Sequence, residues 1–447
     1  MGALSTLPGG KPTQVENRAD PSPTATSLAV ALVLALSATT IALANLDSRP
    51  GRDFQLHTIL LASDLALLAL IGIGVGGLRV AIRSWRSHAC VLAALALGLS
   101  MMPAALVNPS DRGAAALVRW SGAVALGLAV GSARRDGRRL VVGALALVTL
   151  AHVSVAFGQR AAGGPIGLDA LGEARSHEIG GLYASSGLTV HPYVLAAWCA
   201  VAGTALLALQ RRRPAAGGLT TVAGIAAFAG IGLTMSRAGA LGAALALAVL
   251  SLSTRRPRDR RWRAPAAGAA AALALGALVN LSGWISRAGQ ASGSVDAISS
   301  GRGALVRQAW ALLRDDLLTG VGPGRYVLAL VERPALVELS SQSPRPVHVT
   351  PLLLVVEGGL VVVPALILLV LAVVRACRRA GATATAVALA MVPFLALDHL
   401  AWSYPQGMVL AGVWLGVIDL LSQRDDADPV EDAQERSGPS GPPEAPA

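Results

Sequence analysis

The stretch PLLLVVEGGLVVVPALILLVLAVV, residues 351–374, indicates how this chain folds. Its one charged residue is Glu357, and the remaining side chains are apolar or glycine. As an α-helix rising about 1.5 Å per residue, this stretch is long enough to cross the roughly 30 Å hydrocarbon core of a bilayer. We therefore predict that it spans a membrane.

Similar apolar segments recur along the chain and are separated by short charged segments. The chain is 53% hydrophobic and 14% charged, with a mean hydropathy of +0.58, which lies outside the usual range of soluble domains. The sequence predicts an all-α, polytopic membrane protein with about 12 transmembrane helices. The predicted spans are 27–46, 54–78, 88–107, 114–133, 140–158, 188–209, 217–235, 238–253, 264–283, 351–374, 382–401 and 405–421.

The net charge of +11 would suggest a nucleic acid partner in a soluble chain. Here the basic residues lie in short loops between apolar segments, so we expect anionic lipid head groups, and no nucleic acid, as the counter-charge. The three cysteines have neither the spacing of metal ligands nor a disulfide pattern. The chain also lacks the glycine-rich and nucleophile motifs of common cofactor and hydrolase sites, and we expect no cofactor or metal.

Arginines are concentrated in alternate loops, as the positive-inside rule requires of cytoplasmic loops. This alternation predicts an even number of spans and cytoplasmic termini. We predict that residues 1–26 and the acidic residues 422–447 are disordered tails, and that residues 27–421 form one transmembrane domain. The arginines that define the cytoplasmic side are Arg79, Arg83, Arg86, Arg134, Arg135, Arg138, Arg139, Arg211, Arg212, Arg213, Arg255 to Arg263, Arg375, Arg378 and Arg379.

The longest loop that this topology places outside the cell comprises residues 284–350. Apolar residues recur in it at helical spacing and oppose charged residues, which predicts an amphipathic helix on or beside the membrane surface. A helix that packs only on neighbouring loops is the alternative. The apolar residues are Ala304, Leu305, Ala309, Leu312 and Leu313, and the charged residues are Arg307, Arg314 and Asp315.

The string Gly-Val-Gly-Pro-Gly at 320–324 resembles a phosphate-binding loop in composition. It follows a predicted helix and contains proline, so we favour a turn that ends this helix, in which glycine supplies positive φ.

Polar residues at the predicted outer boundary are candidates for function, because charge near hydrocarbon is costly. Arg237 lies at a tight outward junction between two spans, where it could contact lipid phosphate or grip the phosphate of a substrate. His348 lies just before the span that begins at Pro351, where an imidazole could serve structure or acid-base chemistry. Six of the chain's seven histidines fall on the outer half of this topology.

Three short segments follow one another on the predicted outer side. The first reads Ser-Arg-Ala-Gly-Ala at 236–240. The second reads Ser-Gly-Arg-Gly-Ala-Leu-Val at 300–306 and continues to Thr-Gly-Val-Gly-Pro-Gly at 319–324. The third reads Val-His-Val-Thr at 347–350 and continues to Glu-Gly-Gly-Leu at 357–360. Together they resemble the motifs of the O-antigen ligase and O-antigen polymerase superfamily.

The resemblance extends over roughly residues 175–421, with substitutions at several motif positions. Ala238 replaces a glycine, Val306 a tryptophan, Leu317 a proline and Val349 an asparagine. A fainter match lies at 191–196, where Tyr193 stands at a position that is often asparagine.

This resemblance implies a bacterial membrane glycosyltransferase of cell-envelope biogenesis. Such an enzyme would move a glycan from an undecaprenyl-diphosphate carrier to a glycan, lipid or protein acceptor at the outer face of the cytoplasmic membrane. Arg237 and Arg302 would hold the donor's diphosphate, and His348 would act as the catalytic base. Transfer would be inverting and independent of metal.

Further candidate substrate contacts are Arg175, Glu357, Tyr193, Asp398 and His399. A secondary transporter or flippase of envelope precursors is the main alternative, since twelve spans with cytoplasmic ends are common among transporters. Its polar residues should lie near mid-membrane, where Asp64 and Arg119 are the clearest charges. An inactive structural partner of an envelope assembly complex is a third possibility.

Overall fold

The computed structural model describes residues 23–37, 39, 41–45, 59–133, 135–174, 177–179, 181–212, 217–253, 262–289, 302–337 and 344–423. The predicted tails lie almost wholly outside these residues. The first helix begins at Pro23 and the last ends at Ser422.

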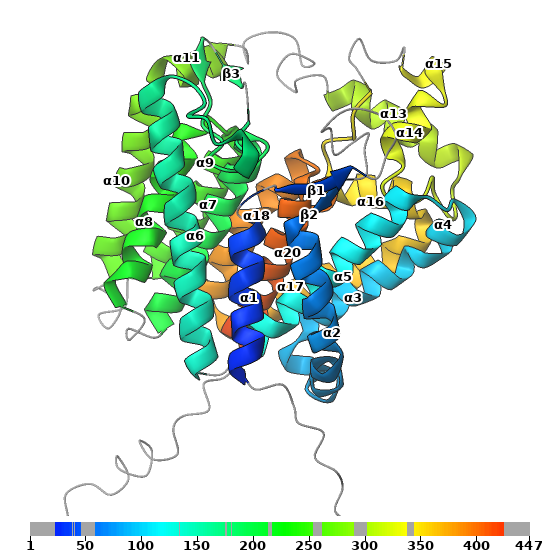
Figure 1. The fold of residues 1–447 in the computed structure, drawn as a ribbon, viewed down its shortest axis with the longest axis horizontal. Helices are drawn as coiled ribbons and strands as arrows, with labels where there is room; N and C mark the ends of the chain where they lie inside the picture. The colour runs from blue at the N-terminus through cyan, green and yellow to red at the C-terminus, as the bar shows by residue number, and fades with distance from the viewer. Residues whose placement is uncertain are drawn as a thin grey trace, which may run out of the picture.

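Long helices run side by side between two ends of the molecule, and short helices and strands gather at one of these ends (Figure 1). The helices are α1 (Pro23–Ser37), α2 (Ala62–Arg83), α3 (Ala89–Ser100), α4 (Met102–Val107), α5 (Asp111–Gly131), α6 (Arg135–Ala162), α7 (Pro192–Arg212), α8 (Gly217–Leu233), α9 (Arg237–Leu252), α10 (Arg263–Val279), α11 (Leu281–Gly289), α13 (Arg302–Asp315), α14 (Tyr326–Val331), α15 (Pro334–Val337), α16 (Thr350–Gly358), α17 (Val363–Ala380), α18 (Ala382–Leu397), α19 (Leu400–Ser403) and α20 (Pro405–Ser422).

Among the described residues, six helical segments are long and apolar enough to cross a membrane. They are Ala89–Val107, Asp111–Gly131, Gly137–Ala162, Pro192–Arg212, Leu360–Ala380 and Pro405–Ser422. Six shorter apolar helices of 10–17 residues are Thr26–Ser37, Ala62–Gly72, Gly218–Leu233, Arg237–Leu252, Arg263–Val279 and Ala382–Leu397. Each segment overlaps one predicted span, so the all-α architecture of a multi-pass membrane protein is confirmed. The count of twelve crossings stays a prediction.

The span predicted at 351–374 is not one continuous helix. It is divided at Gly359, with a φ of 71°, into α16 and α17, and the segment long and apolar enough to cross a membrane is Leu360–Ala380.

The spans predicted at 27–46 and 54–78 also differ from the structure. Helix α1 ends at Ser37, and strand β1 (Ala42–Asn45) pairs antiparallel with β2 (Ile59–Leu61) before α2 begins. Asp64, in the first turn of α2, accepts a hydrogen bond from the Leu61 backbone N–H at 2.9 Å. The carboxylate thus ends the strand and favours the start of the helix. A second antiparallel pair joins β3 (Glu178–Ile179) and β4 (Leu182–Tyr183).

Asp64 and Arg119, the two charges predicted to lie within spans, pair with each other. Arg119 Nη2 lies 2.7 Å from Asp64 Oδ2, and Arg119 Nε donates to Asp64 Oδ1 at 2.9 Å. Arg119 Nη2 also donates to the Ile59 carbonyl oxygen. This bidentate pair connects α5 to the β2–α2 junction, so both charges serve the fold.

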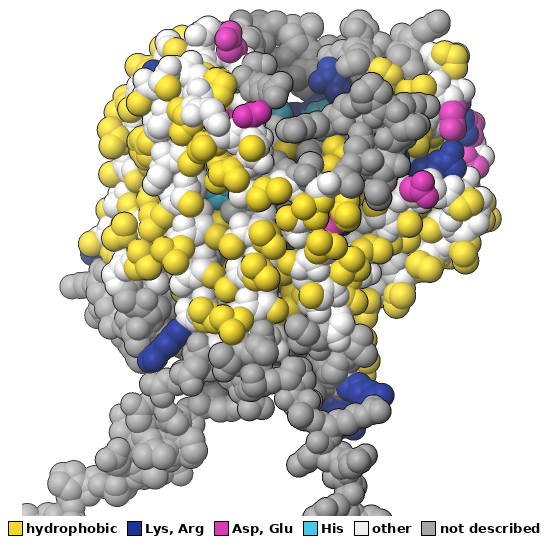
Figure 2. All heavy atoms as spheres, in the orientation of Figure 1, with side chains coloured by type: hydrophobic (Ala, Val, Ile, Leu, Met, Phe, Trp, Pro, Cys, Tyr) yellow, Lys and Arg dark blue, Asp and Glu magenta, His cyan; other side chains and the backbone are white. Residues whose placement is uncertain are grey.

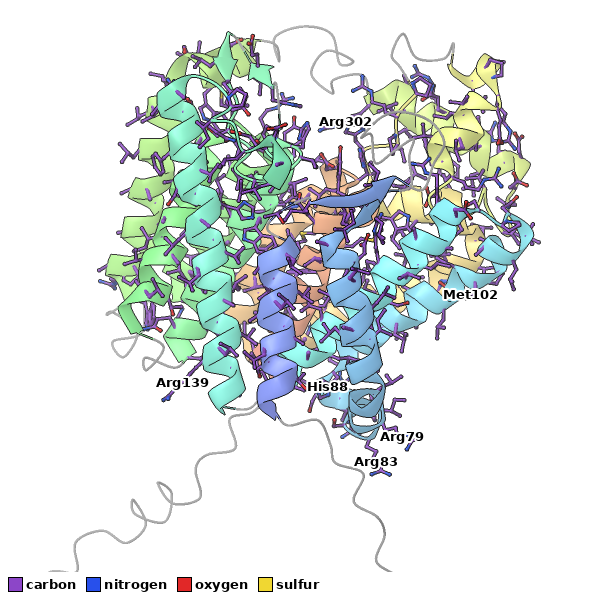
Figure 3. The ribbon with its side chains drawn as sticks, in the orientation of Figure 1. Arg79, Arg83, His88, Met102, Arg139 and Arg302 are labelled. Carbon is purple, nitrogen blue, oxygen red and sulfur yellow. The ribbon has the colours of Figure 1, made fainter. Side chains whose placement is uncertain are left out.

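The arginines that define the two predicted sides lie at opposite ends of the molecule. Arg79, Arg83 and Arg139 lie at one end, and Arg302 lies at the other (Figure 3). At the Arg79 end, Arg212 donates to the Ala380 carbonyl oxygen at 2.9 Å. This grouping of arginines at one end agrees with their alternation between loops in the sequence. That this end faces the cytoplasm and the Arg302 end faces outward stays a prediction.

Helix α20 forms the centre of the bundle, and α17 lies at its edge. In the apolar part of Pro405–Ser422, which is α20, 94% of the residues are buried. In the apolar part of Leu360–Ala380, which contains α17, 17% are buried. Glycines allow α20 and α5 to approach closely, because a Cβ added at Gly412 would collide with the Ala123 carbonyl oxygen. Hydrophobic side chains cover the middle of the molecule between its two ends (Figure 2). This surface is the part of the protein that suits contact with lipid.

Candidate active site

A polar cavity of about 280 Å³ lies at the Arg302 end of the molecule. Figure 2 shows a hollow at this end, with histidine and basic side chains visible in it. The cavity is formed by residues from the start of α7, the start of α13, the segment before α16 and the turn between α18 and α20. We call it the donor cavity, after the glycan donor that the sequence resemblance predicts, and its lining residues are His177, His191, Tyr193, Arg302, Arg345, His348, Asp398, His399 and Tyr404.

Arg302 is the first residue of α13, whose amphipathic character is confirmed. Leu305 and Leu312 are buried, whereas Arg307 and Arg314 are exposed. The buried face of α13 packs on α16 and α15. This packing holds Arg302 at the edge of the donor cavity.

The Gly-Val-Gly-Pro-Gly string forms a turn, as predicted. Gly320, Gly322 and Gly324 have φ values of 64°, 96° and 66°, which only glycine adopts readily. The Val321 and Gly322 backbone N–H groups donate to the carbonyl oxygens of residues 356 and 357, at 3.0 and 2.9 Å. These amides are therefore engaged with α16 and do not form a phosphate loop.

Glu357 is 3% exposed and connects three segments. Its carboxylate accepts hydrogen bonds from the Gly324 N–H at 2.7 Å, the Tyr326 N–H at 3.2 Å and Trp402 Nε1 at 2.6 Å. Glu357 lines a smaller pocket of about 60 Å³ beside the donor cavity, together with Arg112 and Arg119. Its carboxylate thus positions the loop that contains the donor cavity's residues.

His348 is held in one orientation by a backbone bond. Its Nδ1 lies 3.0 Å from the Pro346 carbonyl oxygen. A carbonyl oxygen only accepts hydrogen bonds, so Nδ1 carries the proton and Nε2 is the acceptor of the neutral ring. The ring of His399 packs edge-on against His348 with centroids 4.9 Å apart, and Tyr404 stacks on His399 at 5.6 Å.

The surroundings keep both imidazoles neutral near pH 7. Burial lowers the pKa of His348 to about 4, with further lowering by His399, Arg302 and Arg345 and an opposing contribution from Asp398. Burial likewise lowers the pKa of His399 to about 4. His348 is therefore in the protonation state that a general base requires.

Asp398 begins the short turn that contains His399. Its Oδ1 accepts hydrogen bonds from the His399 and Leu400 backbone N–H groups at 2.7 and 3.0 Å. These bonds end α18 at Leu397, so the span predicted at 382–401 is shorter than expected. Burial raises the pKa of the Asp398 carboxyl, and the nearby His348 opposes this effect.

Arg237 is the first residue of α9, at the same end of the bundle. The Ser236 hydroxyl caps this helix by accepting from the Gly239 N–H at 3.1 Å. A Cβ added at Gly239 would lie 2.9 Å from Ala196 of α7, one turn from Tyr193 of the donor cavity. Among the described residues, Arg237 is not part of the cavity lining, whereas Tyr193, Asp398 and His399 are. Arg175 lies outside the described residues.

Sequence reasoning did not single out four of the cavity residues. His177 belongs only to the group of outer histidines, and His191 also begins the fainter match at 191–196; the two rings lie 4.1 Å apart. Arg345 and Tyr404 belong to no motif of the three segments. The one available signal was that Arg345 lies three positions before His348.

Comparison with protein families gives one match. Residues 222–364 match a family model described as O-antigen ligase. This range contains Arg237, Arg302, Arg345, His348 and Glu357, and no curated protein matches the chain. The family resemblance predicted from the three motifs is thereby confirmed over this range.

Proposed function

We propose that this chain is a membrane glycosyltransferase of the O-antigen ligase type. It transfers a glycan from an undecaprenyl-diphosphate carrier to an acceptor hydroxyl at the outer face of the cytoplasmic membrane. The observation that supports this proposal most directly is that Arg302 and His348, from opposite ends of one loop, line the same cavity. Both residues also lie within the family match.

In the proposed reaction, Arg302 binds the diphosphate and stabilises the negative charge that develops on it. A guanidinium group suits this task because it offers several donors in one plane and stays charged. Arg237 would approach the same diphosphate from the α9 side. Because guanidinium groups supply the positive charge, we propose that transfer does not require a divalent metal.

His348 Nε2 accepts the proton of the acceptor hydroxyl. The hydroxyl oxygen forms a bond to the anomeric carbon while the bond from that carbon to the diphosphate oxygen breaks. A single displacement of this kind inverts the configuration at the anomeric carbon. The carboxyl group of Asp398, which favours the charged form of His348, offsets the charge of the resulting imidazolium.

The carrier's polyprenyl tail requires an apolar surface next to the polar cavity. A groove of about 460 Å³ extends between α17, α18 and α20, from Thr350 and Trp402 to Cys377 and Arg378. The Thr350 hydroxyl donates to the Asp398 carbonyl oxygen at 2.8 Å, so the groove begins beside a residue of the donor cavity. We propose that the tail lies in this groove.

The transporter alternative receives no support from the charges on which it would depend. Asp64 and Arg119 form a bidentate pair with each other, in the arrangement of a structural contact. The acceptor could be a second carrier-linked glycan, a different lipid or a protein, and each can be supplied separately in an assay.

The proposal is tested by transfer in vitro with purified protein, a glycan on undecaprenyl diphosphate, and each acceptor in turn, with EDTA present. We expect His348→Ala and Arg302→Ala to lose transfer, whereas Arg307→Ala, on the exposed face of α13, retains it. Full activity of either cavity variant would overturn the mechanism. A requirement for added divalent metal would overturn the role of the arginines in charge neutralisation.

A further inference from the structure

The donor cavity contains a second arginine that the motifs do not include. We propose that Arg345 binds the donor's diphosphate together with Arg302, as a further guanidinium group on the same leaving group. This inference rests on the proposed function, because it assigns a residue to the donor site.

The geometry brings the two arginines together from distant parts of the loop. Arg302 is the first residue of α13, and Arg345 lies three positions before His348, on the segment that leads into α16. Both side chains are half-buried, and both line the donor cavity. The cavity therefore has a guanidinium group on each of two of its walls.

The charges of the cavity favour an anion with two phosphate groups. Arg302 and Arg345 stay charged at any pH the protein would meet, and Asp398 is the one carboxyl group among the described lining residues. One guanidinium group can grip one phosphate with two parallel hydrogen bonds, so a diphosphate suits a pair of arginines.

Two arginines of this loop, Arg325 and Arg333, form ion pairs on the surface. Arg333 lies 3.4 Å from Asp315 and 3.3 Å from Asp316, and Arg325 lies 3.3 Å from Glu332. Neither Arg333 nor Arg325 lines the donor cavity among the residues that the structure describes. Arg333 is therefore a matched control for Arg345: the same residue type in the same loop, outside the cavity.

Arg345 also links donor binding to the base. It faces His348 and His399 together with Arg302, and it lowers the pKa of both imidazoles. A bound diphosphate would offset this positive charge, so the pKa of His348 would rise and the base would become stronger when the donor is present. Asp398 acts in the same direction on His348, and the other titratable groups that line the cavity are His177, His191, Tyr193 and Tyr404.

The test measures binding of glycan-free undecaprenyl diphosphate to the purified full chain in detergent, with undecaprenol as a probe that has the tail alone. Wild type should bind the diphosphate more tightly than undecaprenol. Arg345→Gln should weaken diphosphate binding about ten- to one-hundred-fold, the usual cost of losing charge-assisted hydrogen bonds. The affinity of Arg345→Lys for the diphosphate should lie between those of wild type and Arg345→Gln, because lysine keeps the positive charge but lacks the planar guanidinium group. Undecaprenol binding, and both affinities of Arg333→Ala, should not change.

Kinetics of transfer separate binding from a general effect on the fold. Arg345→Gln should raise the KM for the donor and move the acidic limb of kcat/KM to higher pH, because the charge that lowers the pKa of His348 is gone. Equal binding of diphosphate and undecaprenol by wild type would overturn the proposed function. In another outcome, wild type prefers the diphosphate over undecaprenol while Arg345→Gln keeps the same preference and the same acidic limb. This result would overturn the role of Arg345 and leave the proposed function standing.

Discussion

Two neighbouring polar regions at the Arg302 end each contain arginine and a carboxylate, in different arrangements. The first is the donor cavity defined above. The second, which we call the paired cluster, comprises the Asp64–Arg119 ion pair with Glu357 and Trp402, and Arg119, Glu357 and Trp402 line a pocket of about 60 Å³. In the paired cluster, Arg119 binds Asp64 and the Glu357 carboxylate accepts three hydrogen bonds. In the donor cavity, Arg302 and His348 face a space of about 280 Å³.

The difference between the two regions suggests how a structural polar residue can be told from a functional one. A charged group whose partners are protein groups stabilises the fold, and replacing it should cost stability. A polar or charged group that lines a cavity can contact a ligand there, and replacing it should cost activity. The sequence alone cannot separate these cases, because Glu357 and His348 lie in the same motif.

The largest effect should follow from His348→Gln, which keeps a polar side chain but removes the base. We expect transfer to fall by about 10²- to 10⁴-fold, the usual contribution of general-base catalysis. The midpoint of thermal denaturation in detergent should stay close to that of wild type. A variant that is both active and less stable would place His348 with the paired cluster instead.

The replacement Asp64→Asn should lower the stability of the protein. This change leaves the largely buried Arg119 without its carboxylate partner, and breaking such a pair costs about 3–5 kcal/mol of stability. The thermal midpoint should fall clearly below that of Asp111→Asn, a control on the exposed first turn of α5. An unchanged midpoint would contradict a structural role for the pair.

A smaller loss of stability should follow from Glu357→Gln. Hydrogen bonds to a charged group contribute about 1.5–3 kcal/mol, and the amide can replace only part of them. Because Glu357 connects the 324–326 segment to Trp402, limited proteolysis should cut the loop of the variant faster than that of wild type. Equal rates of cleavage would show that the loop is held by its apolar contacts alone.

The smallest effect concerns the pH dependence of transfer. His348 acts as a base only when neutral, so activity should fall as pH drops through its pKa. With that pKa at about 4, the acidic limb of kcat/KM should lie well below the ordinary histidine value of 6.5. Asp398→Asn should move the limb lower still, because Asp398 favours the charged imidazole. A limb near 6.5 in wild type would contradict the burial of His348.

Much of the fold was predictable because membrane thickness and helix geometry determine the length of an apolar segment. The two strand pairs were not, because strands of two to four residues are too short to show a periodicity that separates them from helix or loop. Arg302 and His348 were identified by their motifs. Arg345 and Tyr404 could not be, because they reach the cavity through tertiary contacts between distant segments.

The most direct test of the account is electron cryomicroscopy of the protein with bound undecaprenyl diphosphate. The account predicts that the diphosphate lies within about 3 Å of the Arg302 and Arg345 guanidinium groups, the distance of a charge-assisted hydrogen bond. The tail should follow the groove between α17 and α18. A diphosphate in the pocket lined by Arg112 and Arg119, or a tail that enters from another side of the bundle, would contradict it.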